Sequence, residues 1–418
     1  MDLTTNKNKS SFKFNPFDPE FHANPYPAYQ QLRSREPVHQ HFLGSWGLTR
    51  YADVKAILRH PQIRSDNLPQ RLQNKNNYLE HKSQNLNALV QVTSTWLLSL
   101  EPPDHTRIRK LVGKAFSPVE IERLRPKVQQ IVDDLIDKVQ QNGSMDIISD
   151  IARPLPVRVI SMMLGIPEET QSQVDQWAND LSGILDPLNS LETLVYMDEV
   201  VLKFSKSLEK LILEREQAPK RDLISAFIAA RDEGDKLNHN ELLTTCMLLF
   251  GTGEETTVNL IGNGMLALFH HPNQMELLKH EPNLIQSAVE EFARYDSPIQ
   301  RIARVALEDV EIGNQVIHAG EQLILYLGAA NRDPAQFLDA DRLDITRTDN
   351  YHLAYADGIH YCLGAALAKL EAQVAINTLI QRLPDLQLQT DKLEWRKNIA
   401  LRGLKSLPVK FNSSQARK

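Results

Sequence analysis

One long apolar segment constrains the fold of this chain more than any other part of its sequence. Helical spacing of apolar residues begins near Asn238 or Asn240 and continues to about His271, directly before Pro272. About thirty residues at ~1.5 Å per residue span about 50 Å, enough to cross a large domain. Apolar side chains lie on nearly all sides of this helix, so it has to be buried among other elements. The sequence therefore predicts a large, mostly helical domain built around this segment.

The remaining segments predict more helices and only short strands. Ser117-Pro118-Val119-Glu120 reads as a capping box, and the apolar spacing behind it predicts one helix that continues until Gly143. In "VEIGNQVI", Gly313-Asn314 is typical of a two-residue hairpin turn. The Asn- and Gln-rich stretch 62–100 is weakly periodic, and part of it is predicted to be a functional loop.

No repeat or Gly/Ser-rich linker divides the chain of 418 residues. We expect residues 15–411 to form one mainly α domain with small β-sheets. We expect residues 1–14 to be disordered and residues 412–418 to form a flexible tail.

Composition excludes several classes of protein. The hydrophobic share of 42% and charged share of 24% are typical of a globular protein with a real core. A net charge of -6 without a long basic run argues against nucleic acid as the main partner. The start lacks the apolar region of a signal peptide, and no stretch approaches the ~18 to 20 apolar residues of a membrane span. Two cysteines cannot form a disulfide framework. We therefore expect a cytoplasmic monomer without a membrane anchor.

The two cysteines have different surroundings. Cys246 lies on the apolar face of the long helix, which is typical of a buried core residue. Cys362 lies in "YADGIHYCLGAALAKLE", between Gly358 and Gly364 and at the start of an alanine-rich helix, where N–H groups favour a thiolate. No second cysteine is nearby, which argues against zinc or iron–sulfur ligation. A Cys–His hydrolase stays possible but needs its histidine elsewhere in the fold. The other solution is a thiolate that binds the metal of a non-protein ring, namely haem.

This loop resembles the haem-binding signature of the cytochromes P-450, the haem–thiolate monooxygenases, which reads Phe-Gly-x-Gly-x-His-x-Cys-x-Gly. Gly358, His360, Cys362 and Gly364 match it, while Tyr355 replaces the phenylalanine and Ala356 replaces the first glycine. The resemblance implies the cytochrome P-450 fold, with the long helix crossing the haem. It also implies haem b with Cys362 as the axial ligand. A tyrosine hydroxyl at position 355 would alter hydrogen bonding around the sulfur and hence the iron potential, in a direction that the sequence leaves open.

Glu291 and Arg294 match the Glu-x-x-Arg motif of the same family. Side chains at i and i+3 meet on one helix face, so an ordinary surface ion pair is the simplest interpretation. In the family the pair is structural and ties its helix to the meander before the cysteine loop. The meander corresponds here to Asn331–Asp344, in which Arg342 departs from the usual phenylalanine.

Within the long helix, "FGTGEETTVN" interrupts the apolar pattern with glycines, acids and threonines. Buried carboxylates and helical glycines are both costly, so a functional site or a solvated patch has to explain them. The segment resembles the oxygen-binding motif Ala-Gly-x-Glu/Asp-Thr, with Thr252 in place of the alanine. The resemblance implies that Gly253 lies at the cofactor, that Thr256 hydrogen-bonds dioxygen and that Glu255 helps to relay protons.

A third segment, "EPPDHTRIRKLVGKAF", resembles the part of the family that anchors the haem propionates. As a helix it places His105 and Arg109 on one face, and arginine pairs well with carboxylates. Arg304 and His360 match the remaining propionate ligands, with Arg301 as a reserve. The opposite face is expected to meet solvent or an acidic redox partner, and it carries Arg107, Lys110 and Lys114.

The resemblance extends over nearly the whole chain and implies an enzyme that inserts one oxygen atom of O2 into a small apolar or amphiphilic molecule. Hydroxylation and epoxidation both stay open, as does the identity of the substrate. Electrons would come singly from a separate ferredoxin or flavodoxin with its reductase. By analogy, the substrate pocket would include Leu249, Thr252, Ile302 and Leu401. Three alternatives remain: a peroxide-driven peroxygenase or isomerase of the same fold, a non-catalytic haem protein that senses or stores a gas, and a helical scaffold without a cofactor.

Overall fold

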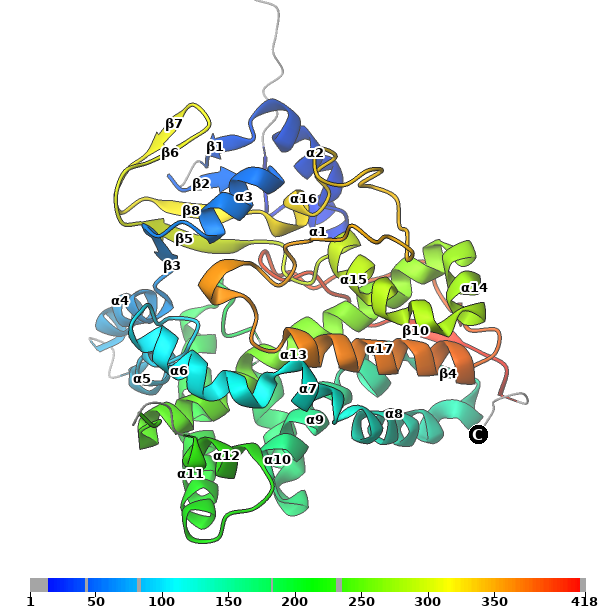
Figure 1. Ribbon diagram of the computed structural model, residues 1–418, viewed down its shortest axis with the longest axis horizontal. Coiled ribbons are helices and arrows are strands. Elements are labelled where there is room, and N and C mark those ends of the chain that lie inside the picture. Colours follow the sequence, from blue (N-terminus) through cyan, green and yellow to red (C-terminus); the bar gives the residue numbers. More distant parts are fainter. Residues whose placement is uncertain (1–13, 42–43, 81–83, 182, 231–234, 414–418) are drawn as a thin grey trace, which may run out of the picture.

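The fold is described from a computed structural model of residues 14–41, 44–80, 84–181, 183–230 and 235–413. Figure 1 shows most helices gathered on one side of the molecule and the largest sheet on the other. The expected mainly α architecture with small β-sheets is therefore confirmed. Of the segments predicted to be disordered (1–14) or flexible (412–418), residues 1–13 and 414–418 lie outside the described residues. Phe14 and Asn412, at the edges of these segments, make native contacts: Phe14 packs 5.2 Å from Phe21, and the Asn412 N–H donates to the Pro384 carbonyl at 3.0 Å.

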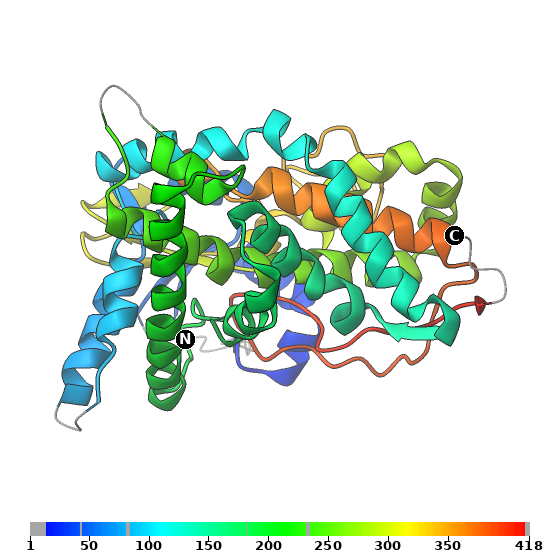
Figure 2. The same cartoon turned by 90° about the horizontal axis from the view of Figure 1, so that it is seen from below.

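The predicted long helix is α13 (His239–His270). Asn238 caps it, because its side chain accepts from the Glu241 N–H while the Glu241 carboxylate accepts from the Asn238 N–H. The elements that pack around it include α9 (Pro154–Leu164), α15 (Ile285–Tyr295), α17 (Ala365–Arg382) and the irregular helical segment η3 (Ile147–Ala152). Figure 2 shows α17 running along the same side of the molecule as α8 (Arg125–Val139), which packs against it. Cys246, on α13, is fully buried in this core, as predicted.

The single helix predicted from Pro118 to Gly143 is wrong. The structure has α7 (Pro118–Glu122) followed by a separate α8 from Arg125. Pro126 lies in the first turn of α8, where its missing N–H costs nothing, but its ring would clash with a continuing helix. The Ser117 side chain still caps α7 by accepting from the Glu120 N–H at 3.4 Å.

The stretch 62–100, predicted to contain a functional loop, is mostly helical. It forms α4 (Leu68–Glu80) and α5 (Asn87–Ser94), because Leu72, Leu89 and Val92 are buried against the rest of the core. The other helices are α1 (Pro19–Ala23), α2 (Tyr26–Arg35), α3 (Tyr51–Leu58), α6 (Asp104–Gly113), α10 (Glu168–Leu181), α11 (Leu191–Gln217), α12 (Leu223–Ala229), α14 (Pro272–His280) and α16 (Leu327–Ala330), with short helical turns η1 (Lys114–Phe116), η2 (Gln140–Asn142), η4 (Pro282–Leu284) and η5 (Gly358–His360). None of the helices in these described ranges combines the length and apolar character that a membrane crossing requires.

The strands form three small sheets. The largest has the order β1-β2-β8-β5-β3, with β1 (Val38–Gln40), β2 (Trp46–Leu48), β8 (Gln322–Leu325), β5 (Ile302–Ala306) and β3 (Ile63–Ser65). β2 and β8 are parallel and the other pairs are antiparallel. The second sheet joins β4 (Ser144–Asp146), β10 (Pro408–Lys410) and β9 (Gln387–Leu388). The predicted hairpin is confirmed as β6 (Val310–Ile312) and β7 (Gln315–Ile317), with Gly313 at φ 59°.

Candidate active site

The cysteine loop is held in one conformation by its backbone. The Cys362 N–H donates to the Tyr355 carbonyl at 3.0 Å, and α17 begins three residues after the cysteine. Gly358 has φ 71°, and a Cβ there would lie 2.4 Å from the Leu58 carbonyl oxygen, so only glycine fits. Ala356 also adopts the left-handed region, at φ 58°. That is where the family signature has its first glycine, so this chain accepts strain that the signature avoids.

The Cys362 side chain keeps accessible surface although many protein atoms surround it. Burial raises the pKa of the thiol, while the Gly364 and Ala365 N–H groups and the Arg109 charge act in the opposite direction. The protein by itself thus holds the neutral thiol, and coordination to a metal cation would remove its proton. Tyr355 approaches through its carbonyl only: its hydroxyl is buried and has no hydrogen-bond partner among the described residues, so the structure shows no hydrogen bond from this tyrosine to the sulfur.

Four predicted cofactor-binding side chains come together from distant segments. The His105 and His360 rings lie 4.5 Å apart, and the Arg109 guanidinium on α6 donates to the Tyr361 carbonyl at 2.5 Å. Arg304 on β5 is opposite Ser65 on β3, and the Ser65 N–H donates to Glu101, whose carboxylate lies 3.5 Å from His360 Nε2. The sheet register and α6 therefore place all four beside the loop of Cys362.

These side chains offer more donors than the protein itself can use. Among the described residues, neither ring nitrogen of His105 nor Nε2 of His360 has a hydrogen-bond partner, although all three atoms are buried. Arg304 is 7% exposed, and its Nη1 donates to the Ala303 carbonyl at 2.9 Å. Burial lowers the pKa of Arg304 to about 10 and that of His105 to about 4. Buried cations and donors without acceptors fit an anionic ligand, and the fork of arginine favours carboxylates.

One face of α13 stays accessible in the middle of an otherwise buried helix. That face carries Leu249, Thr252, Gly253 and Thr256, which are three, one and three positions apart. All four residues retain exposure. A Cβ on Gly253 would meet no atom within 4 Å, and the same is true of Gly364 at the start of α17. The two glycines thus leave room for a bulky group. The Thr256 hydroxyl makes only a long contact of 3.5 Å to the Thr252 carbonyl, which leaves it able to bind a ligand.

The two acids in the middle of this helix, buried Glu254 and partly buried Glu255, face arginines that the sequence did not suggest. Arg153 lies 3.7 Å from Glu254, and Arg396 Nη1 donates to Glu255 at 3.1 Å. Burial raises the pKa of Glu254 to about 7 and also raises that of Glu255, against the charge of Arg396. A solvated patch is therefore excluded for Glu254, which is 5% exposed. Both arginines lie about 100 or more residues from the acids in sequence, so no spacing pattern could have revealed them.

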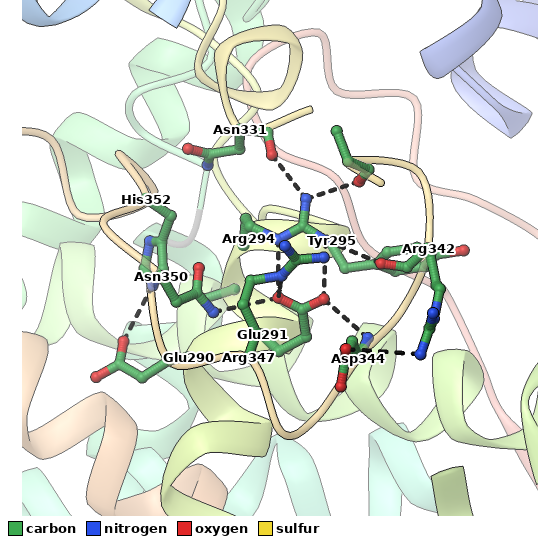
Figure 3. Close-up of polar contacts among 12 residues, drawn as sticks. Glu290, Glu291, Arg294, Tyr295, Asn331, Arg342, Asp344, Arg347, Asn350 and His352 are labelled. Atoms are coloured by element: carbon green, nitrogen blue, oxygen red, sulfur yellow. Dashed lines mark hydrogen bonds and ion pairs between the residues drawn. The ribbon is translucent and has the colours of Figure 1, made fainter. Parts of the chain in front are cut away.

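The Glu291–Arg294 pair is fully buried and is not a surface ion pair. Arg294 donates to both carboxylate oxygens of Glu291, at 2.7 and 2.8 Å. It also donates to three carbonyls of the predicted meander, those of Asn331, Ala340 and Arg342 (Figure 3). Glu291 in turn accepts from the Asp344 N–H, Arg347 and Asn350. The pair thus ties α15 to the segment that leads into the cysteine loop.

The four predicted pocket residues all keep partial exposure. Leu249 and Thr252 lie on the accessible face of α13, and Ile302 begins β5. Leu401 forms an isolated β-bridge with Ile299, which brings the C-terminal loop beside β5. One expectation for the outer face of α6 is wrong: Arg107 does not simply meet solvent, because it bonds to the carboxylate of Glu241 on α13.

A haem fits these residues. The accessible thiol, the unpaired buried donors and the openings at Gly253 and Gly364 suit a flat ring that carries carboxylates and a metal.

Comparison with known proteins agrees with this geometry. The family described as Cytochrome P450 matches residues 38–410. The polyketide biosynthesis cytochrome P450 PksS of Bacillus subtilis (strain 168) is 39% identical over 96% of this chain and 98% of its own length. The 6-deoxyerythronolide B hydroxylase of Saccharopolyspora erythraea is 36% identical over 94% of this chain and 97% of its own length.

A solved structure is equally similar. P450BioI, in complex with an acyl carrier protein that bears hexadec-9Z-enoic acid, superposes with a TM-score of 0.87 at 40% identity. The match covers 94% of this chain and 99% of that one. With the fold, the cysteine loop and the family match in agreement, the chain belongs to the cytochrome P450 family and is a monooxygenase of that family.

Proposed function

We propose that the chain holds haem b through Cys362 and inserts one oxygen atom of O2 into an apolar or amphiphilic molecule. The observation that supports this most strongly is the accessible Cys362 thiol beside four buried or half-buried donors, next to which only the carboxylate of Glu101 lies, 3.5 Å from His360 Nε2, among the described residues. A haem with a thiolate ligand supplies the oxygen-activating chemistry when it is bound, since the ligand pushes electron density toward O–O cleavage.

In this proposal the protein contributes binding, orientation and protons. His105, Arg109, Arg304 and His360 donate to the propionates, which gives partners to the unpaired ring nitrogens of the two histidines. Gly358 fixes the cysteine loop, and Gly253 and Gly364 leave the space that the ring needs.

Proton supply is assigned to the middle of α13. Thr256 holds its hydroxyl on the accessible face, where it would donate a hydrogen bond to the O2 substrate. Glu255, whose pKa is raised by burial, passes protons toward that hydroxyl. The acid and the threonine are adjacent in sequence on a buried helix, which favours O2-driven chemistry over the peroxide-driven and gas-sensing alternatives, neither of which requires a proton relay.

We infer that a separate ferredoxin or flavodoxin, with its reductase, delivers the electrons. Lys110 and Lys114 are exposed on α6 and its continuation, next to the cysteine loop that Arg109 contacts. Exposed Ile359 and Tyr361 lie in that loop itself. A basic, partly apolar surface at this place suits an acidic electron carrier.

The substrate class is proposed from the aliphatic residues and from the relatives. Leu249, Ile302 and Leu401 give the site an apolar lining. The names of the relatives mention polyketide biosynthesis, 6-deoxyerythronolide B and hexadec-9Z-enoic acid on an acyl carrier protein. We therefore propose a long acyl or polyketide chain, either free or attached to a carrier protein. Titration with hexadec-9-enoic acid, free and carrier-bound, should produce a low- to high-spin absorption change if this is correct.

The decisive test of the function is spectroscopic. The reduced carbon monoxide complex of the purified protein should show the strongly red-shifted Soret band of a thiolate ligand, and Cys362→Ala should abolish it while Cys246→Ala leaves it unchanged. A colourless protein, or a Cys362→Ala variant that keeps the band, would contradict the proposal.

A further inference from the structure

Buried polar atoms without partners gather in a second place, apart from the proposed cofactor site. Among the described residues, they include both side-chain amide atoms of Asn259, Oδ1 of Asn263, Nε of Arg396 and Oε2 of Glu254. Native proteins leave few such atoms unsatisfied, so a cluster of them calls for partners outside the chain. Around His105 and His360 a haem can be that partner. No cofactor is implied at Asn259 and Asn263.

Two of these residues, Asn259 and Asn263, lie in a row with Glu255 along α13. The three are four residues apart, so they share one helix face at intervals of ~6 Å. This face adjoins the one that carries Thr256. We call Glu255, Asn259 and Asn263, together with Arg396, the polar strip.

The C-terminal loop covers the polar strip along its whole length. Arg396 bonds to Glu255 at 3.1 Å, and the Asn263 amide donates to the Arg402 carbonyl at 3.0 Å. Between them Gly403 packs so closely on Asn259 that an added Cβ would lie 1.7 Å from Oδ1. The loop thus seals the strip from solvent, and Asn259 and Asn263 are each 1% exposed.

Open space adjoins the strip at its far end and beside the loop. A groove of about 500 Å³ is lined by Asn263, His270, Trp395 and Arg402, among others. A small cavity of about 20 Å³ is lined by Arg396, Gly403 and Gln300, whose Oε1 is also buried and unpaired. A cavity of that size with several polar atoms holds one water molecule.

We propose that ordered water molecules occupy the polar strip and connect Glu255 with the groove, so that protons enter the active site along this face of α13. Asn259 can both donate to and accept from water, whereas Asn263 can only accept through Oδ1, because its NH2 group already donates to the Asp296 and Arg402 carbonyls. One water spans the ~6 Å between successive residues. Arg396 closes the inner end and holds the Glu255 carboxylate in place. The hydration of the strip stands on the unpaired atoms alone, whereas its role in proton supply rests on the proposed function.

Two variants of matched shape test the hydration. Asn259→Val removes every polar atom from the position, and Asn259→Thr keeps one hydroxyl on a side chain of the same outline. If water fills the strip, the valine variant loses water contacts and unfolds about 1–3 °C below the threonine variant. If the strip is dry, valine relieves two unsatisfied atoms and the order of the midpoints reverses, which would refute the proposal. Circular dichroism melts decide between these results without reference to activity.

Oxygen reduction by the holoprotein tests the proton route. With a surrogate ferredoxin and its reductase, we expect Asn259→Val to raise the share of electrons recovered as hydrogen peroxide at least twofold and to increase the solvent isotope effect on oxygen uptake. The peroxide share and the isotope effect of Asn259→Thr should lie nearer to those of the parent protein. A valine variant that is destabilised but has an unchanged peroxide share and isotope effect would make the water purely structural and overturn the route. Parent protein that binds haem yet takes up no oxygen would overturn the proposed function, and the route with it, while the melting result for hydration would stand.

Discussion

Replacing Glu291 by glutamine removes one charge from the fully buried pair on α15 and almost no volume. Its two carboxylate oxygens accept five hydrogen bonds, two from Arg294 and one each from the Asp344 N–H, Arg347 and Asn350 (Figure 3). A glutamine has one oxygen and one NH2 group at these two places. Whichever way the amide lies, its NH2 group faces either two or three donors that then lose their acceptor.

The magnitude follows from the better of the two orientations. With the NH2 group at the Oε1 position, Arg294 Nη2 and the Asp344 N–H lose their acceptor, at about 1–3 kcal/mol for each buried donor. The charge of Arg294 is also left without its counter-ion, and breaking a buried pair costs about 3–5 kcal/mol in total. The estimate from the lost hydrogen bonds and the estimate from the broken ion pair both give a loss of about 4 kcal/mol in the free energy of unfolding. That is a large part of the ~5–15 kcal/mol by which a typical protein is stable.

Equilibrium urea unfolding of the parent and the variant measures this loss, and Glu120→Gln provides the matched control. Glu120 and Arg123 have the same i, i+3 spacing on a helix, but both side chains are exposed, so the control should change by less than about 0.5 kcal/mol. A double-mutant cycle with Arg294→Met should show a coupling above about 2 kcal/mol, because the second change removes the stranded charge. If Glu291→Gln costs less than about 1 kcal/mol, burial does not set the strength of this pair and the reasoning is refuted.

Three further predictions concern the cofactor and the acids of α13. Thr256→Ala should divert electrons to hydrogen peroxide, whereas Thr257→Ala, whose buried hydroxyl already bonds to the Gly253 carbonyl at 3.1 Å, should not; equal peroxide yields would mean that Thr256 only packs. Burial raises the pKa of Glu254 from 4.5 to about 7. The contribution of the protonated Glu254 to stability is therefore full below pH 4.5 and is lost as the pH rises to about 7. In urea titrations, Glu254→Gln should stabilise the protein by up to about 3 kcal/mol at pH 8 and by little at pH 5. Arg304→Gln should weaken haem retention at least about tenfold in transfer assays to a haem acceptor protein, since it removes a buried charged donor, and unchanged retention would place the propionates elsewhere.

Sequence reasoning worked best where a short segment carries its own physical signature. The apolar pattern and cap of α13, the turn at Gly313-Asn314 and the loop around Cys362 depend on residues a few positions apart, so their spacing alone predicts their structure. The same reasoning has two limits. The weak periodicity of 62–100 did not predict α4 and α5, whose buried residues pack on the core, and the apolar pattern behind Pro118 hid the local break at Pro126.

The sequence by itself determined that this chain buries a long helix and presents one cysteine, between glycines, to a ligand. Only the tertiary structure decided what the two acids of α13 face, that Glu291 and Arg294 are fully buried, and that Asn259 and Asn263 lie in a sealed strip. The partners concerned, Arg153, Arg396 and Gly403, are about 100 to 144 positions away along the chain. Local spacing sets which face a side chain takes on its own helix, but the free energy of a buried charge or amide depends on atoms brought to it by the fold.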